Sequence, residues 1–332
     1  MSDGPSCIVV GAGISGLLAA GELQGEGWDV TVLEKDRRVG GRMATRRVGE
    51  GDFDHGAQFF TVRGERFADV VDNWLSAGVA AEWTRGFADA EGQPNEDGYP
   101  RYRGTEGMSS IPRYVSRGLD VRTGEMVVTV YSGDAGWEVV CESGLRVAGN
   151  ALVLAVPVPQ ALDLTSSGHY ALPDEARRQL EAVSYDPCLA LMVLLDGPSG
   201  VPEPGGMQIK DEPLDWICDN QHKGISKVPG LMVHAGPEWS RSHFEDDEAE
   251  ITRHLISLAG ERLGSDLTPS VVKTSLARWR YSWVTNSHPE PCLAASEDPP
   301  LLFCGDAFGQ PKVEGAALSG LAAADRLLAR DA

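Results

Sequence analysis

A glycine-rich turn between two short apolar runs constrains the fold of this chain more than any other feature. The run Cys7–Val10 is long enough for one buried parallel strand, and it leads directly into Gly11-Ala12-Gly13-Ile14-Ser15-Gly16. A helical segment follows, and then a second apolar run, Asp29–Leu33, which ends at Glu34. This order of strand, glycine turn, helix, strand and acid predicts a βαβ unit that binds a dinucleotide.

The residues of this unit have distinct expected tasks. Gly11 makes the tight turn, Gly13 lets the backbone approach the pyrophosphate, and Gly16 lets the helix pack closely on the strand. The diphosphate lies on free amides at the start of the helix, so Ala12, Ile14 and Ser15 join the predicted contacts. Glu34 lies 18 residues after the last glycine, where an acid accepts hydrogen bonds from ribose hydroxyls and disfavours a 2′-phosphate. FAD and NAD both fit this unit.

Two further segments favour a flavin. The sequence Arg38-Val39-Gly40-Gly41-Arg42-Met43-Ala44-Thr45 places a guanidinium fork after two glycines, as a second phosphate clamp requires. Near the other end, 301–306 is predicted as a buried strand that ends in Gly305-Asp306, and Val313-Glu314-Gly315-Ala316 begins a helix rich in small residues.

This pattern resembles the superfamily of amine oxidases, protoporphyrinogen oxidases and phytoene desaturases. The resemblance implies noncovalent FAD, with Asp306 at the ribityl chain or pyrophosphate and the helix near Glu314 directed at the pyrimidine edge of the flavin. Such a helix N-terminus favours reduced, anionic flavin. Backbone groups near Met126 and Val127 are expected to contact the adenine. The remaining cofactor contacts expected are Lys35, Gly41, Arg42, Met43, Gly56, Ala57 and Gln58.

We therefore predict an α/β protein, α+β overall, in which a mixed-sheet substrate domain is inserted into a discontinuous Rossmann-like FAD domain of the amine-oxidase type. The FAD domain is predicted over residues 1–57, 107–158 and 291–332, and the substrate domain over 58–106 and 159–290. Residues 120–130 and 136–141 alternate as in a small antiparallel meander, and 151–157 is predicted as another buried strand. The stretch 91–99 is typical of a surface loop.

Several segments resemble the renalase family, in particular its bacterial branch. They are Asp54-His55-Gly56-Ala57-Gln58-Phe59-Phe60-Thr61-Val62-Arg63, Pro213-Leu214-Asp215-Trp216, His234-Ala235, Glu238-Trp239-Ser240-Arg241 and Arg278-Trp279-Arg280-Tyr281. The resemblance implies an oxidase of NAD(P) isomers that are reduced at the 2 or 6 position of the nicotinamide. FAD takes two electrons and passes them to oxygen, which yields NAD(P)⁺ and hydrogen peroxide. A dihydropyridine gives up hydride directly, so no catalytic side-chain base is predicted.

A flat nicotinamide over a flavin requires aromatic walls and a few polar anchors. The predicted substrate-binding residues are Gln58, Phe59, Phe60, Thr61, Arg63, Trp216, His234, Trp279 and Tyr281. For each aromatic residue, packing in the core is the competing interpretation, and for His234 a hydrogen-bonded core histidine is an equal alternative. Trp239 and Trp283 are further aromatic candidates.

Two other functions fit the same motifs. One is an amine oxidase or a desaturase of another small molecule, although no lysine can be assigned to the flavin; Lys273 and Lys312 are the nearest in sequence order. The other is a flavin-binding redox sensor without turnover.

Composition excludes some partners. The chain of 332 residues has a net charge of −20, which repels nucleic acids and anionic lipids. No apolar run approaches the roughly 20 residues that span a bilayer, and no signal peptide is visible at the start. The six cysteines are scattered without metal-ligand spacing, so we expect no metal and no disulfide framework. A cytoplasmic location and a small-molecule substrate, with oxygen as the second reactant, complete these expectations.

Overall fold

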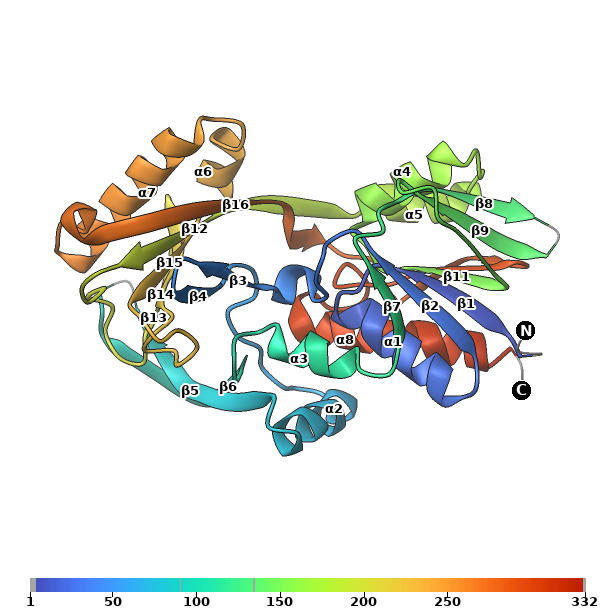
Figure 1. Ribbon diagram of the computed structural model, residues 1–332, viewed down its shortest axis with the longest axis horizontal. Helices are drawn as coiled ribbons and strands as arrows, with labels where there is room; N and C mark the ends of the chain where they lie inside the picture. Colours follow the sequence, from blue (N-terminus) through green and yellow to red (C-terminus); the bar gives the residue numbers. More distant parts are fainter. Residues whose placement is uncertain (1–3, 90, 134, 331–332) are drawn as a thin grey trace.

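The computed structural model describes residues 4–89, 91–133 and 135–330, and two large sheets organise it (Figure 1). The first sheet has the strand order β17-β18-β11-β1-β2-β7. β17 runs antiparallel to β18, and the other neighbours pair in parallel. Its strands are β1 (Ser6–Val10), β2 (Asp29–Glu34), β7 (Asp120–Thr123), β11 (Ala151–Leu154), β17 (Leu293–Glu297) and β18 (Pro300–Phe303).

Both faces of this parallel sheet are covered. The helices α1 (Ile14–Gly25), α8 (Lys312–Leu328) and α3 (Ser110–Val115) lie on one side (Figure 1). On the other side lie a three-stranded sheet and two helices, whose bounds are β8 (Val127–Gly133), β9 (Gly136–Cys141), β10 (Arg146–Gly149), α4 (Val158–Ser167) and α5 (Asp174–Glu181). Burial on both faces explains why residues 7–10 of β1 and all of β11 are apolar.

The second sheet is mixed, with seven strands in the order β16-β12-β15-β14-β13-β5-β6. α6 (Pro237–Ser242) and α7 (Glu248–Leu263) cover one of its faces (Figure 1). The other face packs against the hairpin of β3 (Thr45–Val48) and β4 (Gly51–Asp54). The seven strands are β5 (Ala80–Ala88), β6 (Pro94–Gly104), β12 (Ser184–Leu195), β13 (Gly206–Asp211), β14 (Leu214–Asp219), β15 (Gly230–Ala235) and β16 (Val271–Asn286).

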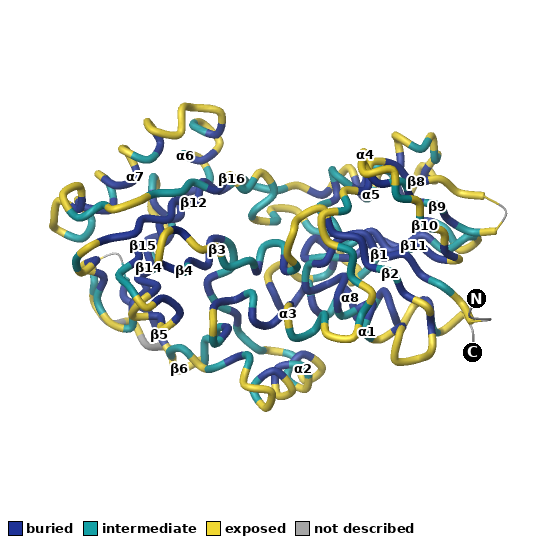
Figure 2. The backbone as a smooth tube through the Cα atoms, viewed as in Figure 1, coloured by how far each residue is buried: buried dark blue, intermediate teal, exposed yellow. Residues whose placement is uncertain are grey.

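The long strands β12 and β16 extend between the two halves of the molecule, and each half has a buried interior (Figures 1 and 2). α2 (Glu65–Ser76) is amphipathic and buries Phe67 and Trp74. The described residues also form two short 3₁₀ helices, Gly41–Met43 and Thr268–Ser270.

α7 shows how local sequence sets the ends of an element. The Asp247 side chain caps its first amides, and Gly264 ends it in the left-handed region at φ 68°.

The structure confirms the predicted α/β class and corrects two predicted elements. β1, α1 and β2 form the expected parallel βαβ unit. Residues 120–123 do not belong to the meander but pair with β2 at the edge of the large sheet, since that edge offers a parallel partner. The predicted loop 91–99 contains the start of β6, which forms a hairpin with β5 despite its glycine and proline. Within the described residues, no helix is long and apolar enough to cross a membrane.

Candidate functional site

The glycine turn after β1 holds three glycines for three physical reasons. Gly11 has φ +105°, and a side chain there would lie 2.6 Å from the Ala155 carbonyl oxygen. At Gly16 a Cβ would lie 2.1 Å from the Gly11 carbonyl oxygen, so only glycine lets α1 approach the strand. Gly13 differs, because its φ is −72° and a Cβ there would meet no protein atom within 4 Å. Neither packing nor backbone conformation requires glycine at 13, which fits a position kept bare for a bound diphosphate.

Glu34 is a buried acid at the end of β2. Its two carboxylate oxygens accept hydrogen bonds from the Ala12 and Asp36 amides, at 2.8 and 2.9 Å. Burial raises the pKa of Glu34, and these two amides partly oppose that rise. Each oxygen keeps a free lone pair for a ribose hydroxyl. Lys35, predicted beside it, is exposed.

The segment expected at the adenine lies next to this acid. The Glu125 amide donates to the Glu34 carbonyl oxygen at 2.9 Å, which fixes the start of β8 beside the end of β2. Met126 is 39% exposed while Val127 is buried, so the two residues face different surroundings. Both predicted adenine contacts therefore lie beside Glu34, at the end of β2.

The second phosphate clamp lies directly against the first. Gly13 forms an isolated parallel bridge with Gly40, and a Cβ on Gly41 would lie 3.7 Å from the Gly13 Cα. Both Gly40 and Gly41 have positive φ, at 123° and 52°. Met43 is buried in the core below. The two glycine turns thus form one backbone cradle.

Arg42 and Asp306, two predicted cofactor residues from opposite ends of the chain, bind each other. The Arg42 fork donates to the two carboxylate oxygens of Asp306 at 2.7 and 2.5 Å. It also donates to the Tyr281 carbonyl oxygen at 3.2 Å. Burial opposes the charge of Arg42, but Asp306 outweighs this effect and raises the pKa of Arg42. The fork therefore links the clamp, the last strand and β16.

The start of α8 is tied to the segment before α2. The Glu314 carboxylate accepts hydrogen bonds from the Arg63 and Gly64 amides, the shortest at 2.7 Å. Gly315 is necessary because a Cβ there would lie 1.5 Å from the Gln310 carbonyl oxygen. Gly305 has φ +140° and donates its amide to Ser319 at 2.8 Å. Val313 is buried and Ala316 partly buried in the core that this junction forms.

The segment 54–58 rests on the clamp and faces the second sheet. The Ala57 amide donates to the Arg42 carbonyl oxygen at 2.8 Å, and a Cβ on Gly56 would lie 2.1 Å from the same oxygen. Gln58 directs its amide nitrogen to the Gly56 carbonyl oxygen and toward the His234 ring nitrogen, at 3.0 and 3.4 Å. The structure therefore brings predicted cofactor-binding and substrate-binding residues to one place.

Aromatic side chains surround this segment. Trp279 donates its indole N–H to the His55 carbonyl oxygen at 2.7 Å, and its ring stacks on the His55 ring with centroids 5.1 Å apart. Phe59 contacts Trp216 at 5.8 Å between centroids. Trp216 lies opposite His234 in the β14–β15 pairing, so their side chains share one face of the sheet.

Four predicted substrate residues lie elsewhere. Phe60 is buried in the core beneath α2, where it stacks on Tyr102 at 5.6 Å between centroids. Its neighbour on the other side of the backbone, Phe59, takes the sheet-facing position instead, because successive side chains of an extended segment alternate. Thr61 is half-buried, and Arg63 is exposed beside Glu314. Tyr281 lines a separate cavity.

Both histidines at the junction are neutral at pH 7. Burial, helped by the nearby Lys223 charge, lowers the pKa of His234 to about 4. Burial also lowers the pKa of His55 to about 3, with Arg46 and His234 as further causes. Neither imidazole is therefore charged near neutral pH, and the site offers uncharged hydrogen-bonding groups beside aromatic rings.

Sequence reasoning missed a buried ion pair under this segment. The Lys223 ammonium lies 2.7 Å from an Asp54 carboxylate oxygen, and both side chains are fully buried. The other Asp54 oxygen accepts from the Thr45 hydroxyl and the Met108 amide, at 2.6 and 2.8 Å. The Lys223 ammonium also lies over the Trp83 ring, 5.0 Å from its centroid. Asp54 stood in a quoted motif, but no sequence signal distinguishes Lys223 from a surface lysine.

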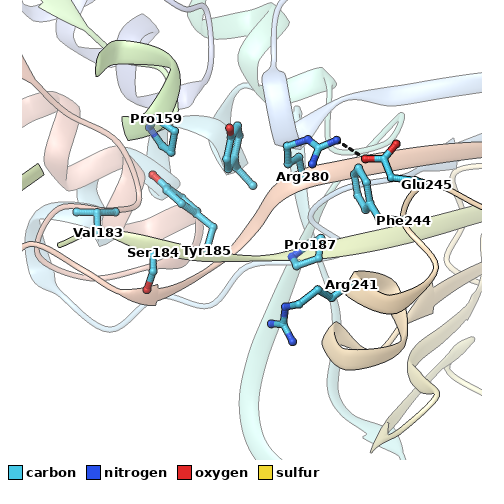
Figure 3. Close-up of a pocket in the computed structure, with 10 residues that line it drawn as sticks. Pro159, Val183, Ser184, Tyr185, Pro187, Arg241, Phe244, Glu245 and Arg280 are labelled. Carbon is cyan, nitrogen blue, oxygen red and sulfur yellow. Dashed lines mark hydrogen bonds and ion pairs between the residues drawn. The ribbon is translucent and has the colours of Figure 1, made fainter. Parts of the chain in front are cut away.

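A cavity of about 500 Å³ opens where β12 and β16 leave the first half of the molecule (Figure 3). Pro159 and Tyr185 lie on one side of it, and Arg280, Phe244 and Glu245 on the other (Figure 3). Tyr185 and Tyr281 meet edge to face, with centroids 5.5 Å apart. Burial and the Asp306 charge raise the pKa of Tyr185 to about 12, so its hydroxyl stays protonated.

The sequence of this chain matches a known protein family. Residues 62–328 match the model of the flavin containing amine oxidoreductases, and residues 9–74 match that of an NAD(P)-binding Rossmann-like domain. Mouse renalase is 26% identical over 95% of this chain and 96% of its own length.

Solved structures share the fold. A putative protoporphyrinogen oxidase from Exiguobacterium superposes with a TM-score of 0.77 at 12% identity, over 99% of this chain and 100% of the other. Putrescine oxidase bound to putrescine superposes with a TM-score of 0.75 at 17% identity, over 98% and 99%. The predicted resemblance to renalase within the amine oxidase superfamily is confirmed.

Proposed function

This chain belongs to the family of flavin containing amine oxidoreductases, and on that premise we propose that it is an FAD-dependent oxidase of 2- or 6-dihydro isomers of NAD(P). The overall reaction converts the isomer, a proton and oxygen into NAD(P)⁺ and hydrogen peroxide. Similarity to mouse renalase along almost the whole chain supports a renalase-like activity. The observation that carries the proposal is the junction of segment 54–58 with the second sheet, where aromatic rings meet polar groups that are uncharged at pH 7.

FAD, when bound noncovalently in the cradle, supplies the hydride acceptor. In the proposal Gly13 and the helix α1 amides hold its diphosphate, and Glu34 holds the adenosine ribose. The protein's own part is to orient a flat ring and exclude water. Hydride loss makes the dihydropyridine aromatic, so the substrate needs no base, and the neutral His234 and Gln58 serve as hydrogen-bonding groups.

The lysines argue for this reaction over amine oxidation. The two lysines first considered for a flavin contact, Lys273 and Lys312, are both exposed. The buried Lys223 is committed to Asp54. An amine oxidase or a desaturase of another molecule is the second candidate, and a redox sensor without turnover is the third; the following experiment distinguishes them.

We expect 6-dihydro-NAD or 2-dihydro-NAD to bleach the flavin within seconds under anaerobic conditions. Ordinary NADH and simple amines should do so far more slowly, because hydride transfer requires the reacting carbon about 3–3.5 Å from the flavin. Stopped-flow absorbance of the oxidised flavin measures each rate. Readmitting air should restore the colour rapidly and generate peroxide.

The outcomes separate the candidates. A primary amine that bleaches the flavin faster than either isomer makes the protein an amine oxidase. No bleaching by any of these donors favours the sensor. Arg63→Ala should raise KM for the dihydro isomer while the protein stays yellow, since this exposed guanidinium is the proposed contact for the carboxamide or the ribose of the substrate's nicotinamide half.

Removing either end of the cofactor cradle should lower FAD affinity. Glu34→Ala removes the proposed charge-assisted bonds to the ribose, and Arg42→Ala removes the proposed phosphate contact together with the pair to Asp306; each loss should weaken FAD binding about ten- to a hundredfold. Acid precipitation followed by absorbance of the supernatant measures occupancy. Colour that stays in the pellet contradicts noncovalent binding. Arg47→Ala removes an exposed arginine from neighbouring β3 and should leave occupancy unchanged.

A further inference from the structure

The cavity of Figure 3 is lined by three residues to which the proposed flavin chemistry gives no role, Arg241, Arg280 and Tyr281. Arg241 ends the segment 238–241, and Arg280 and Tyr281 end the segment 278–281; both segments carried the renalase resemblance. The structure brings all three side chains to the lining of one cavity of about 500 Å³. This volume lies within the range of about 300–1,000 Å³ that is typical of ligand pockets.

The loop of residues 244–246, which contributes Phe244 and Glu245 to the lining of the cavity, is fixed in place. Arg278 donates one hydrogen bond to the Phe244 carbonyl oxygen and another to that of Asp246, the second at 2.8 Å. Arg280 lies over the Phe244 ring, 4.5 Å from its centroid, and pairs with Glu245 at 2.7 Å. The Phe244 ring therefore orients the Arg280 guanidinium independently of its carboxylate partner.

Each of the two cavity arginines pairs with one carboxylate, which an anionic ligand can replace. Their partners are Asp186 for Arg241 and Glu245 for Arg280, and both guanidinium side chains are more than half exposed. Exposed ion pairs contribute little stability, so exchanging a carboxylate for a phosphate has a small cost. Arginine binds phosphate oxygens in a bidentate manner, and two guanidiniums suit a diphosphate.

The aromatic half of the lining suits a heterocyclic base. Tyr185 and Tyr281 meet edge to face, and Pro159 lies beside Tyr185 (Figure 3). Tyr281 is also two residues from Trp279 on β16, and Trp279 stacks on His55 beside the proposed nicotinamide position. Residues two apart on a strand are separated by about 7 Å. The cavity therefore lies next to the proposed nicotinamide position along β16, as the two halves of one bound dinucleotide require.

We infer that this cavity binds the adenosine diphosphate half of the dinucleotide substrate, with the base against Tyr281 and the diphosphate on Arg241 and Arg280. The inference rests on the proposed dinucleotide substrate. It assigns the cavity to substrate and keeps the separate cradle at Gly13 and Glu34 for the cofactor.

Binding of ADP to the holoenzyme tests the cavity without turnover. Calorimetric titration should show ADP binding to the wild type, and Arg241→Gln and Arg280→Gln should each weaken it by about ten- to a hundredfold. Tyr281→Leu should weaken binding, and Tyr281→Phe should retain it. Arg178→Gln removes an arginine from an exposed ion pair on α5, outside the cavity, and is the matched control with unchanged affinity. Absence of ADP binding at millimolar concentration, or equal loss in the control, overturns the inference.

Kinetics provide a second, independent readout. Arg280→Gln should raise KM for 6-dihydro-NAD about tenfold or more and leave KM for 6-dihydronicotinamide mononucleotide unchanged, since only the dinucleotide reaches the cavity. The limiting rate of flavin reduction should stay the same with both. Equal effects on the two substrates contradict the inference. If neither isomer reduces the wild-type flavin, the proposed function fails, while the ADP titration still judges the cavity.

Discussion

Lys223→Met should destabilise the folded protein by about 3–5 kcal/mol, because it leaves the Asp54 carboxylate buried without its counter-ion. Methionine fills a similar volume, so the loss reports the missing charge more than a cavity. Chemical denaturation of the flavin-loaded protein measures the free energy of unfolding. The segment 54–58 should also lose its position, and flavin occupancy should fall with it.

Two comparisons show whether the charge is responsible. Asp54→Asn in the Lys223→Met background keeps an acceptor for Thr45 and Met108 and removes the unpaired charge, so the double variant should regain much of the loss. Arg85→Met breaks an exposed pair with Glu82 at 2.8 Å and should cost less than about 1 kcal/mol. A Lys223→Met protein as stable as the Arg85→Met protein would show that the buried pair contributes nothing.

Among the three glycines of α1, Gly16 should tolerate alanine least, so Gly16→Ala should be strongly destabilising. Its Cβ would lie 2.1 Å from the Gly11 carbonyl oxygen and 3.1 Å from both Ala155 and Val9 side chains. The helix must move away from the strand, which costs about 3 kcal/mol and opens the glycine turn. We expect a protein that purifies with little flavin and unfolds at lower temperature.

Gly21→Ala is the matched control in the same helix. A Cβ at Gly21 meets no atom within 4 Å, so alanine should stabilise the helix by up to about 1 kcal/mol. The two variants differ only in where the methyl group points. Thermal unfolding followed by absorbance of released flavin compares them, and similar melting temperatures would contradict the close packing described for Gly16.

The cofactor side of the molecule could be predicted from sequence because its signals are local. Gly11, Gly13, Gly16 and Glu34 have fixed spacing, and a βαβ unit has few alternatives once those residues are present. The likeness of Arg42 and Asp306 to family motifs placed both at the cofactor, but their mutual ion pair depends on how the two chain ends meet. The spacing of residues along the sequence does not tell which side chains from distant segments form an ion pair.

The substrate side was less predictable because its residues meet only through tertiary packing. Phe59 and Phe60 are adjacent and equally aromatic, yet one faces the second sheet and the other the core under α2. The choice depends on which face of an extended segment meets the sheet. Lys223 is fully buried, although its sequence surroundings in residues 219–224 are polar. The residue-level cofactor and substrate contacts, like the domain division, remain predictions for the experiments above.

The pairing order of the large sheet has a consequence for synthesis of the chain on the ribosome. One neighbour of β1, β2, is close in sequence, but the other, β11, is distant: Ile8 pairs with Leu152, and Leu152 pairs in turn with Leu301 on β18. α8 then docks on α1 through Gly320, whose Cβ position lies 2.1 Å from the Ser15 carbonyl oxygen. Contacts between distant segments slow folding and leave partly folded chains exposed to aggregation. Residues 7–42 contain most of the proposed cradle's motif, yet the strand and helix that complete the fold around them, β18 and α8, come about 260 residues later in the chain.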